Sequence, residues 1–265
     1  MSGTAAPALE VESVHVALRR KPVLHGLSLS LAEGECRAVV GLNGAGKTTA
    51  LRVILGMLRP DTGRVLLYGR DIASTSRDVW RQVGHLVETP FSYPELTARQ
   101  NIEAAARLHG ADPEHAGRLT ARMSEALALT GWLDVPVRRL SLGTRQKVGL
   151  VGALAHEPNV VVLDEPTNGL DPLAVVGFRD LLREVTGHHF DELTRIADRV
   201  DILHRGRIID TIVPEGPGCP GGADLERVFF DAVLAADLAT DSTAPESGAG
   251  PNARVDTSRE RTEVS

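Results

Sequence analysis

The sequence predicts an α/β fold: a mostly parallel sheet with helices on both faces, an antiparallel subdomain at its start and an inserted helical subdomain. Alternating apolar residues at 9–16 and 27–31 indicate two antiparallel strands that open the domain. An apolar strand at 36–40, a glycine loop and a helical stretch then follow one another, which is the order of an α/β unit. Between 90 and 157 the apolar period becomes helical, and a short apolar strand returns at 160–163.

The remaining elements follow from local patterns in chain order. A helix over 48–58 is expected to end at Arg59-Pro60, because proline does not continue a helix. Thr97 and Gln100 form a capping box, which predicts a helix over 102–108. The other expected elements are strands at 64–68 and 83–87, a helix with an apolar stripe at 119–129, a helix that begins at Asp171-Pro172 and a hairpin over 200–212.

These elements divide the chain into five regions. The tail contains almost no large apolar side chains, so it cannot offset the entropy cost of ordering and is expected to be disordered. The regions are a flexible N-terminus at 1–8, an α/β core at 9–89 and 158–213, the helical subdomain at 90–157, an extension at 214–236 and the tail at 237–265.

Composition excludes several classes of protein. The net charge of −6 lacks the basic surplus of a nucleic-acid-binding protein, so no nucleic-acid partner is expected. Cys36 and Cys219 show no metal-ligand spacing, and Cys36 lies in an apolar stretch typical of an inert thiol, which favours a reducing compartment. No apolar run approaches the roughly 18 residues needed to span a bilayer, so we expect a soluble chain.

An eight-residue loop, GLNGAGKT, runs from Gly41 to Thr48 and matches the pattern G-x-x-x-x-G-K-[ST]. In this pattern backbone N–H groups surround phosphate oxygens, and the N-terminus of the following helix faces their negative charge. A chance match is improbable here, because the loop falls between a predicted strand and a predicted helix. The loop predicts binding of ATP and Mg²⁺ by Gly41, Asn43, Gly44, Ala45, Gly46, Lys47, Thr48 and Thr49.

Three side chains of this loop have separate expected roles. Lys47 would neutralise charge on the β- and γ-phosphates, and Thr48 would offer its hydroxyl to Mg²⁺. Thr49 supplies a further donor at the start of the helix. The acidic pair Asp164 and Glu165 follows the apolar strand that returns after the helical insert. Asp164 would hold Mg²⁺ through water, and Glu165 would orient the attacking water and accept its proton; taken alone, the pair also fits a solvated turn.

Two further segments make the chain resemble the ATPase subunit of an ATP-binding-cassette (ABC) transporter over roughly residues 9–235. LSLGTRQ, which begins at Leu140, resembles the signature segment of that family, and EPTNGLDP resembles its interface loop. The resemblance implies that Ser141, Gly143 and the helix N-terminus close over ATP held by a second ATP-binding subunit. It also implies that Asp171 crosses the dimer interface. For Ser141 the alternative is an ordinary helix N-cap.

The segment that joins the core to the helical insert, VGHLVETPFSYPELTARQNI, resembles drug-efflux and bacitracin self-protection exporters. Where the family usually has glutamine touching Mg²⁺ and water, this chain has Glu88, and a carboxylate can do both. Phe91, Tyr93, Pro94 and Leu96 either pack within the subdomain or form a docking groove for a helix of a membrane partner.

The chain departs from the family pattern in two places. The position that usually stacks an aromatic ring on adenine is Leu18 here, which implies weaker stacking. Only four residues separate the helix ending near Val185 from the next, so the family's short apolar strand has no room. His188 matches the family's γ-phosphate sensor, although it is equally well read as an exposed loop residue.

The sequence therefore favours an ATPase that dimerises on the cytoplasmic face of the membrane, bound to a separate transmembrane permease, and powers export of a drug, peptide or other small substrate. The alternative is a regulatory subunit that binds ATP and hydrolyses it poorly, because Leu18 and the shortened His188 region weaken the site. A soluble ABC ATPase of translation or DNA repair would need a tandem cassette, a long coiled coil or a basic surface, and the sequence has none of these.

Overall fold

The computed structural model describes residues 6–88, 92–186, 197–213, 228 and 230–236. Side chains at 77 and 183–186 are not described. The expected tail, Cys219 and the sensor candidate His188 lie outside these residues.

An antiparallel sheet opens the domain, as predicted. Its strand order is β2-β1-β4-β5, and β2 begins six residues earlier than the pattern indicated. Helix α1 covers this sheet and buries Ala50, Val53 and Ile54 in the same apolar cluster as the strands. The elements are β1 (Leu9–Leu18), β2 (Lys21–Leu31), α1 (Lys47–Ile54), β4 (Thr62–Leu67) and β5 (Arg70–Asp71).

The parallel part of the core consists of two separate strand pairs. Strand β3 pairs with β8 in parallel, β8 forms a hairpin with β9, and β6 pairs with β7 in parallel. Across the described ranges, β7 pairs only with β6 and β3 only with β8. The bounds are β3 (Arg37–Val40), β6 (Val83–Leu86), β7 (Val160–Leu163), β8 (Arg199–His204) and β9 (Arg207–Ile212).

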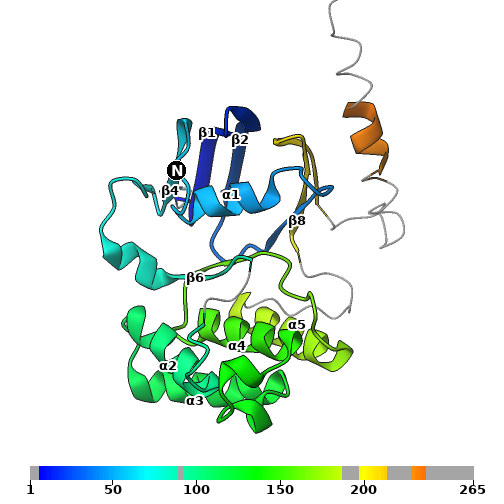
Figure 1. Ribbon diagram of the computed structural model, residues 1–265. Coiled ribbons are helices and arrows are strands. Elements are labelled where there is room, and N and C mark those ends of the chain that lie inside the picture. The colour runs from blue at the N-terminus through cyan, green and yellow to red at the C-terminus, as the bar shows by residue number, and fades with distance from the viewer. Residues whose placement is uncertain (1–5, 89–91, 187–196, 214–227, 229, 237–265) are drawn as a thin grey trace, which may run out of the picture.

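Four helices gather in the lower body of Figure 1, below β6. The predicted capping box begins the first of them: Thr97 accepts a hydrogen bond from the Gln100 N–H, and the Gln100 side chain accepts one from the Thr97 N–H. The helices are α2 (Ala98–Leu108), α3 (Pro113–Ala126), α4 (Leu142–Leu154) and α5 (Pro172–Thr186). Short 3₁₀ turns occupy Arg77–Gln82, Thr130–Trp132 and Val137–Arg139.

Helix α5 packs with the helices, although it falls within the range 158–213 that was expected to belong to the α/β core. Its buried residues Ala174, Phe178 and Leu181 belong to the apolar cluster of the helices. Contact with α3 is close, because a Cβ at Gly177 would lie 2.0 Å from the carbonyl oxygen of Ala126. The apolar stripe of α5 is thus buried against helices.

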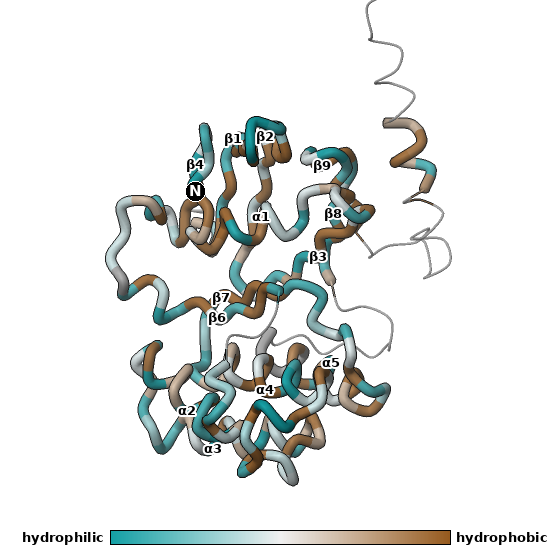
Figure 2. Tube along the Cα trace, viewed as in Figure 1, coloured by the Kyte–Doolittle hydropathy of each residue, from teal (hydrophilic) through white to brown (hydrophobic). Residues whose placement is uncertain are grey.

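Strands β6 and β7 connect the two bodies of the molecule. We call them the strand body, around α1 and the sheet β2-β1-β4-β5, and the helical body, which contains α2, α3, α4 and α5. Val160 and Val162 lie in the cluster of the strand body, while Val161 and Leu163 pack against the helical cluster. Successive side chains of a strand point to opposite faces, so one four-residue strand serves both clusters. Figure 2 shows the apolar course of these strands between the bodies. Within the described ranges, no helix is long and apolar enough to cross a bilayer.

Candidate nucleotide-binding site

The glycine loop leads from β3 directly into α1. Gly46 is the N-cap, with φ of 108°, a conformation that only glycine adopts without strain. Gly41 is required for another reason: a Cβ there would lie 2.4 Å from the carbonyl oxygen of Leu203. No side chain caps α1, so the N–H groups of its first turn remain available to an anion.

Lys47, the first residue of α1, reaches back over the loop. Its ammonium donates hydrogen bonds to the carbonyl oxygens of Gly41, at 2.7 Å, and of Leu42, at 3.3 Å. Both acceptors are uncharged, so a phosphate oxygen would form the stronger, charge-assisted hydrogen bond. The structure thus places the cation of the loop within its concave side.

The acidic residue predicted to hold magnesium lies against the loop. The Thr48 hydroxyl donates to Asp164 Oδ2 at 2.9 Å, and the Asp164 N–H donates to the Leu86 carbonyl at 2.8 Å, which extends the pairing of β7 with β6. A hydroxyl beside a carboxylate is a set of hard oxygen donors that fits Mg²⁺. In the described part of the chain, no group of three acidic, histidine or cysteine residues could hold a metal unaided.

Two acidic side chains near this contact have partners of their own. Glu88 forms an ion pair with Arg52 of α1, so its carboxylate is turned toward a guanidinium. The Glu165 carboxylate accepts a hydrogen bond from the Asn168 side-chain amide. Both residues have positive φ, 63° for Glu88 and 46° for Glu165, which is uncommon for residues other than glycine and often marks functional sites.

The signature segment and the interface loop contact each other within one chain. Ser141 is the N-cap of α4 and accepts a hydrogen bond from the Thr144 N–H at 3.1 Å. A Cβ at Gly143 would lie 2.2 Å from the carbonyl oxygen of Gly169. Ser141 is exposed, so its capping role leaves its outer side open to a partner.

Asp171 has two partners in its own subunit. One carboxylate oxygen accepts from the Ala174 N–H at 2.9 Å, which caps α5, and the other lies 2.7 Å from the Lys147 ammonium. Lys147 and the cap lower the pKa of Asp171. The structure therefore shows Asp171 joining α4 to α5.

Sequence reasoning missed Arg52, Lys147 and Asn168. A signal was available for Arg52, because it lies four residues after Thr48 and so shares a face of α1 with it. No sequence pattern indicated the partners of Lys147 or Asn168. Of the other expected residues, Leu18 is 36% exposed and Tyr93 is 48% exposed, whereas Phe91 and His188 lie outside the described residues.

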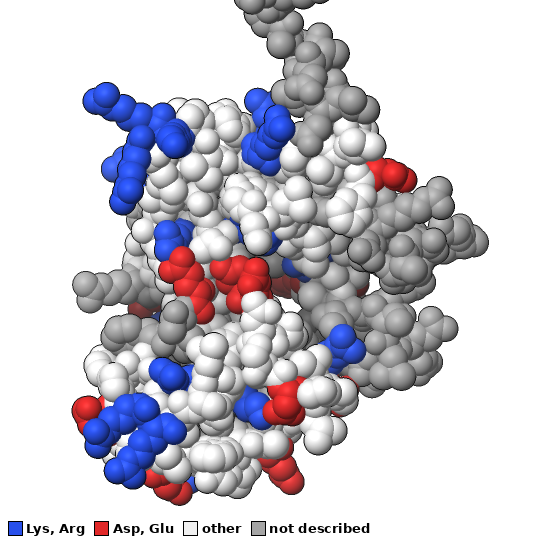
Figure 3. All heavy atoms as spheres, turned by 45° about the vertical axis from the view of Figure 1, so that its right-hand side comes forward, with Lys and Arg blue, Asp and Glu red and all other residues white. Residues whose placement is uncertain are grey.

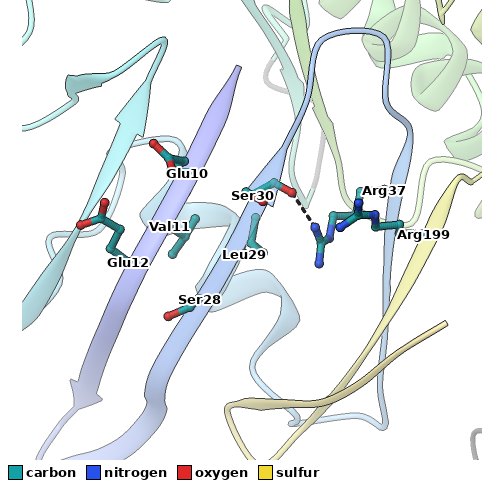
Figure 4. A pocket seen from close by; sticks show the side chains of 8 residues that line it. All are labelled: Glu10, Val11, Glu12, Ser28, Leu29, Ser30, Arg37 and Arg199. Carbon is teal, nitrogen blue, oxygen red and sulfur yellow. Dashed lines mark hydrogen bonds between the residues drawn. The ribbon is translucent and has the colours of Figure 1, made fainter. Parts of the chain in front are cut away.

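A second hollow, drawn in Figure 4, lies away from the glycine loop, between β1, β2 and the edge of β3. The Arg37 guanidinium donates to the Ser30 carbonyl and forms a buried ion pair with Asp201, and Arg199 pairs with Glu35 at 3.2 Å. Both arginines are thus occupied by protein groups.

A glycine loop that opens a helix, with a carboxylate from a neighbouring strand against its threonine, defines the class of phosphate-binding α/β domains. Comparison with known proteins narrows this class. Residues 24–168 match the family model described as "ABC transporter". The chain therefore belongs to the ABC transporter family.

Several characterised relatives are similar over most of the chain. The bacitracin transport ATP-binding protein BcrA of Bacillus licheniformis is 32% identical over 206 residues, 73% of this chain and 65% of BcrA. The Nod factor export ATP-binding protein I of Burkholderia thailandensis is 34% identical over 225 residues, 80% of this chain and 74% of that protein. This chain thus spans slightly less than two thirds of the length of BcrA.

Solved structures confirm the α/β fold. A structure of an ATP-binding subunit of an ABC transporter superimposes with a TM-score of 0.71 at 28% identity, covering 89% of this chain and all of the other. The dimeric, post-hydrolysis structure of the ATP-binding cassette MJ0796 with ADP and Pi has a TM-score of 0.67 at 22% identity, covering 79% of this chain.

Proposed function

We propose that this chain binds ATP with Mg²⁺ at its glycine loop and hydrolyses it as the nucleotide-binding subunit of a membrane exporter. One observation carries the proposal: the hydrogen bond between Thr48 and Asp164 brings the carboxyl end of β7 to the first turn of α1. A carboxylate and a hydroxyl so joined, beside an uncapped helix N-terminus, suit a metal-bound triphosphate.

Each residue of the proposed site has a separate role. Lys47 would exchange its two carbonyl acceptors for β- and γ-phosphate oxygens. Thr48, Glu88 and Asp164 would hold the metal, Asp164 through water. The metal, when bound, neutralises charge on the phosphates. Glu165, on its turn after β7, orients a water and accepts its proton. Asn168 holds the Glu165 carboxylate in place through its hydrogen bond.

The test of the site is the substitution Lys47→Ala. Removing the cation of the loop should weaken binding of a fluorescent ATP analogue by roughly a hundredfold or more, because the phosphates lose their main counter-charge. Lys21→Ala, at the exposed start of β2, is the matched control and should bind as the parent does. Equal affinity in the Lys47 variant and the parent would refute the assignment of the site.

The partners proposed are a second ATP-binding subunit and a transmembrane permease, which would hold the chain at the inner face of the cell membrane. Ser141 and Gly143, at the exposed start of α4, would close over ATP on the second subunit. The names of the relatives, bacitracin transport and Nod factor export, support export of a peptide, drug or other small substrate. A tagged chain purified from detergent-solubilised membranes should carry a permease with it, and its recovery without any membrane protein would oppose this part of the proposal.

A second candidate is a regulatory subunit that binds ATP and turns it over slowly. The observation that favours it is the division of the parallel core, because within the described ranges β3 and β7 each have one strand neighbour. Exposed Leu18 offers no aromatic ring to adenine. A turnover assay beside a binding assay separates the candidates: tight binding with negligible turnover supports the regulatory subunit.

A further inference from the structure

Helix α1 carries a cation that faces the acidic groups of the proposed metal site. Arg52 lies four residues after Thr48, so both side chains lie on one face of the helix. Thr48 contacts Asp164, and Arg52 contacts Glu88. The face of α1 that follows the glycine loop is therefore directed at the carboxyl ends of β6 and β7, where both acidic residues lie.

The charges of this region are coupled to one another. The pKa of Arg52 is raised, first by its hydrogen bond with Glu88 and also by the charge of Asp164. Asp164 and Glu88 lie on adjacent strand ends, since the Asp164 N–H donates to Leu86, two residues before Glu88. The guanidinium thus pairs with Glu88 and acts on Asp164 only at longer range. On the face drawn in Figure 3, acidic and basic side chains likewise gather between the upper and lower bodies.

We propose that Arg52 is the internal counter-ion of the magnesium site, which holds the Glu88 carboxylate when the metal is absent and gives it up when Mg²⁺ arrives with ATP. The inference rests on the proposed function. Glu88 has one carboxylate for two cations, so contact with Arg52 and contact with the metal compete. The exposed ion pair, with side chains 41% and 52% accessible, can open without unfolding its surroundings.

Competition between Arg52 and Mg²⁺ for Glu88 predicts an effect on metal binding that an ordinary surface ion pair would not have. Removing the guanidinium frees Glu88 and leaves the carboxylates without their resident cation, so less Mg²⁺ is needed to occupy the site. Arg52 is then a positioning residue: it acts on the nucleotide only through Glu88. Its loss should change the dependence on metal more than the affinity for ATP in EDTA.

The experiment measures binding of a fluorescent ATP analogue while Mg²⁺ is titrated. In Arg52→Gln the half-saturating Mg²⁺ concentration should fall by about threefold to tenfold, as expected for removal of one competing charge near a partly exposed site. Arg52→Lys keeps the charge and should stay near the parent. In a chain that already carries Glu88→Gln, adding Arg52→Gln should change the half-saturating Mg²⁺ concentration little, because the carboxylate for which Arg52 and Mg²⁺ compete is gone.

A matched control is the exposed ion pair between Arg64 and Glu12, on the antiparallel sheet. Arg64 pairs with Glu12 across β4 and β1, with side chains 57% and 42% accessible, and Arg64→Gln should leave the magnesium titration unchanged. An unchanged or increased half-saturating concentration in Arg52→Gln would overturn the inference, and so would an equal fall in the Arg64 control. A parent chain that fails to bind the analogue in EDTA and in Mg²⁺ would instead refute the proposed function, and the inference with it.

Discussion

At the scale of single residues, the ion pair between Lys147 and Asp171 joins the two segments that the family resemblance assigns to a dimer interface. Lys147 is only 9% exposed and lies 2.7 Å from Asp171, whose other oxygen caps α5. A buried ammonium without its partner is costly, whereas an apolar side chain of similar length is tolerated there. The pair therefore has a structural role in the single subunit, whatever Asp171 does across an interface.

Asp171→Ala should lower the free energy of unfolding, because it removes a helix cap and leaves Lys147 unpaired. Asp171→Asn keeps the cap and should lose less. Adding Lys147→Met to Asp171→Asn should recover most of the difference, since no buried charge remains. Urea unfolding of the four proteins measures these values, and stability that is identical throughout would show that the pair contributes nothing.

A second residue-scale feature is the histidine contact at the junction of the bodies. His156, just after α4, stacks on His109 with ring centroids 4.0 Å apart, and both of its ring nitrogens are buried. Burial, and then the proximity of His109, lower the pKa of His156 to about 4. Burial and His109 also lower the pKa of His85 on β6.

This contact predicts acid sensitivity with a defined sign. The pKa of His156 is lower in the folded chain than its usual 6.5, so the unfolded chain binds the proton more readily. Stability from this group is complete above pH 6.5 and falls as the pH drops toward 4. The loss should be about 1 kcal/mol, less than the full shift would give, because the ring is only partly buried.

Unfolding measured between pH 7 and pH 4 checks the prediction. His156→Phe retains a stacked ring and removes the titration, so its stability should decline less steeply than that of the parent. Parallel declines in the two proteins would show that other groups carry the acid sensitivity.

At the scale of elements, α5 bears on the short strand for which the sequence leaves no room. The chain could repair the sheet locally or leave a gap in it. One route would have 183–186 leave the helix and pair as a strand beside β7. The structure contradicts it, because α5 continues as a helix to Thr186. The apolar stripe explains the outcome: Phe178 and Leu181 are buried in the helical cluster, and unwinding the end of α5 would weaken that packing.

The remaining route leaves a gap in the sheet, with His188 beyond hydrogen-bond reach of the γ-phosphate; it stays a prediction, because His188 lies outside the described residues. His188→Ala should then change ATP turnover by less than about twofold, because a displaced side chain contributes nothing to the transition state. Steady-state phosphate release by the variant and the parent is the measurement. A fall on the order of a hundredfold would show that His188 is a positioned catalytic group and that the ATPase is intact.

At the scale of the whole molecule, two bodies are joined through the strands β6 and β7, whose side chains belong to both apolar clusters. The glycine loop lies on the strand body, and the signature segment lies on the helical body. Under the proposed function, the site that uses both segments is completed by a second ATP-binding subunit.

Glu165→Gln should trap such a dimer. The amide keeps the shape of the carboxylate and cannot accept a proton from water, so ATP stays bound between closed subunits. Size-exclusion chromatography with ATP and Mg²⁺ should show the variant at the dimer position. The double variant with Lys47→Ala should bind ATP too weakly to close and should remain monomeric. A monomeric Glu165→Gln chain with ATP bound would exclude closure across Ser141 and Gly143.

The sequence by itself determined the elements and the phosphate loop. The period of the apolar residues identified the opening strands, α2 and the β8–β9 hairpin, and the spacing of GLNGAGKT placed Lys47 and Thr48 at the start of α1. Such features are local, because each depends on residues within one or two turns of chain.

Only the tertiary structure decided which distant residues meet. The pairs Arg52–Glu88 and Lys147–Asp171 each join segments that no spacing rule relates, and the packing of α5 on the helices depends on which apolar surface lies nearest. The physical reason is that contacts across a sheet or between helices are set by the packing of whole elements, which local periodicity does not encode.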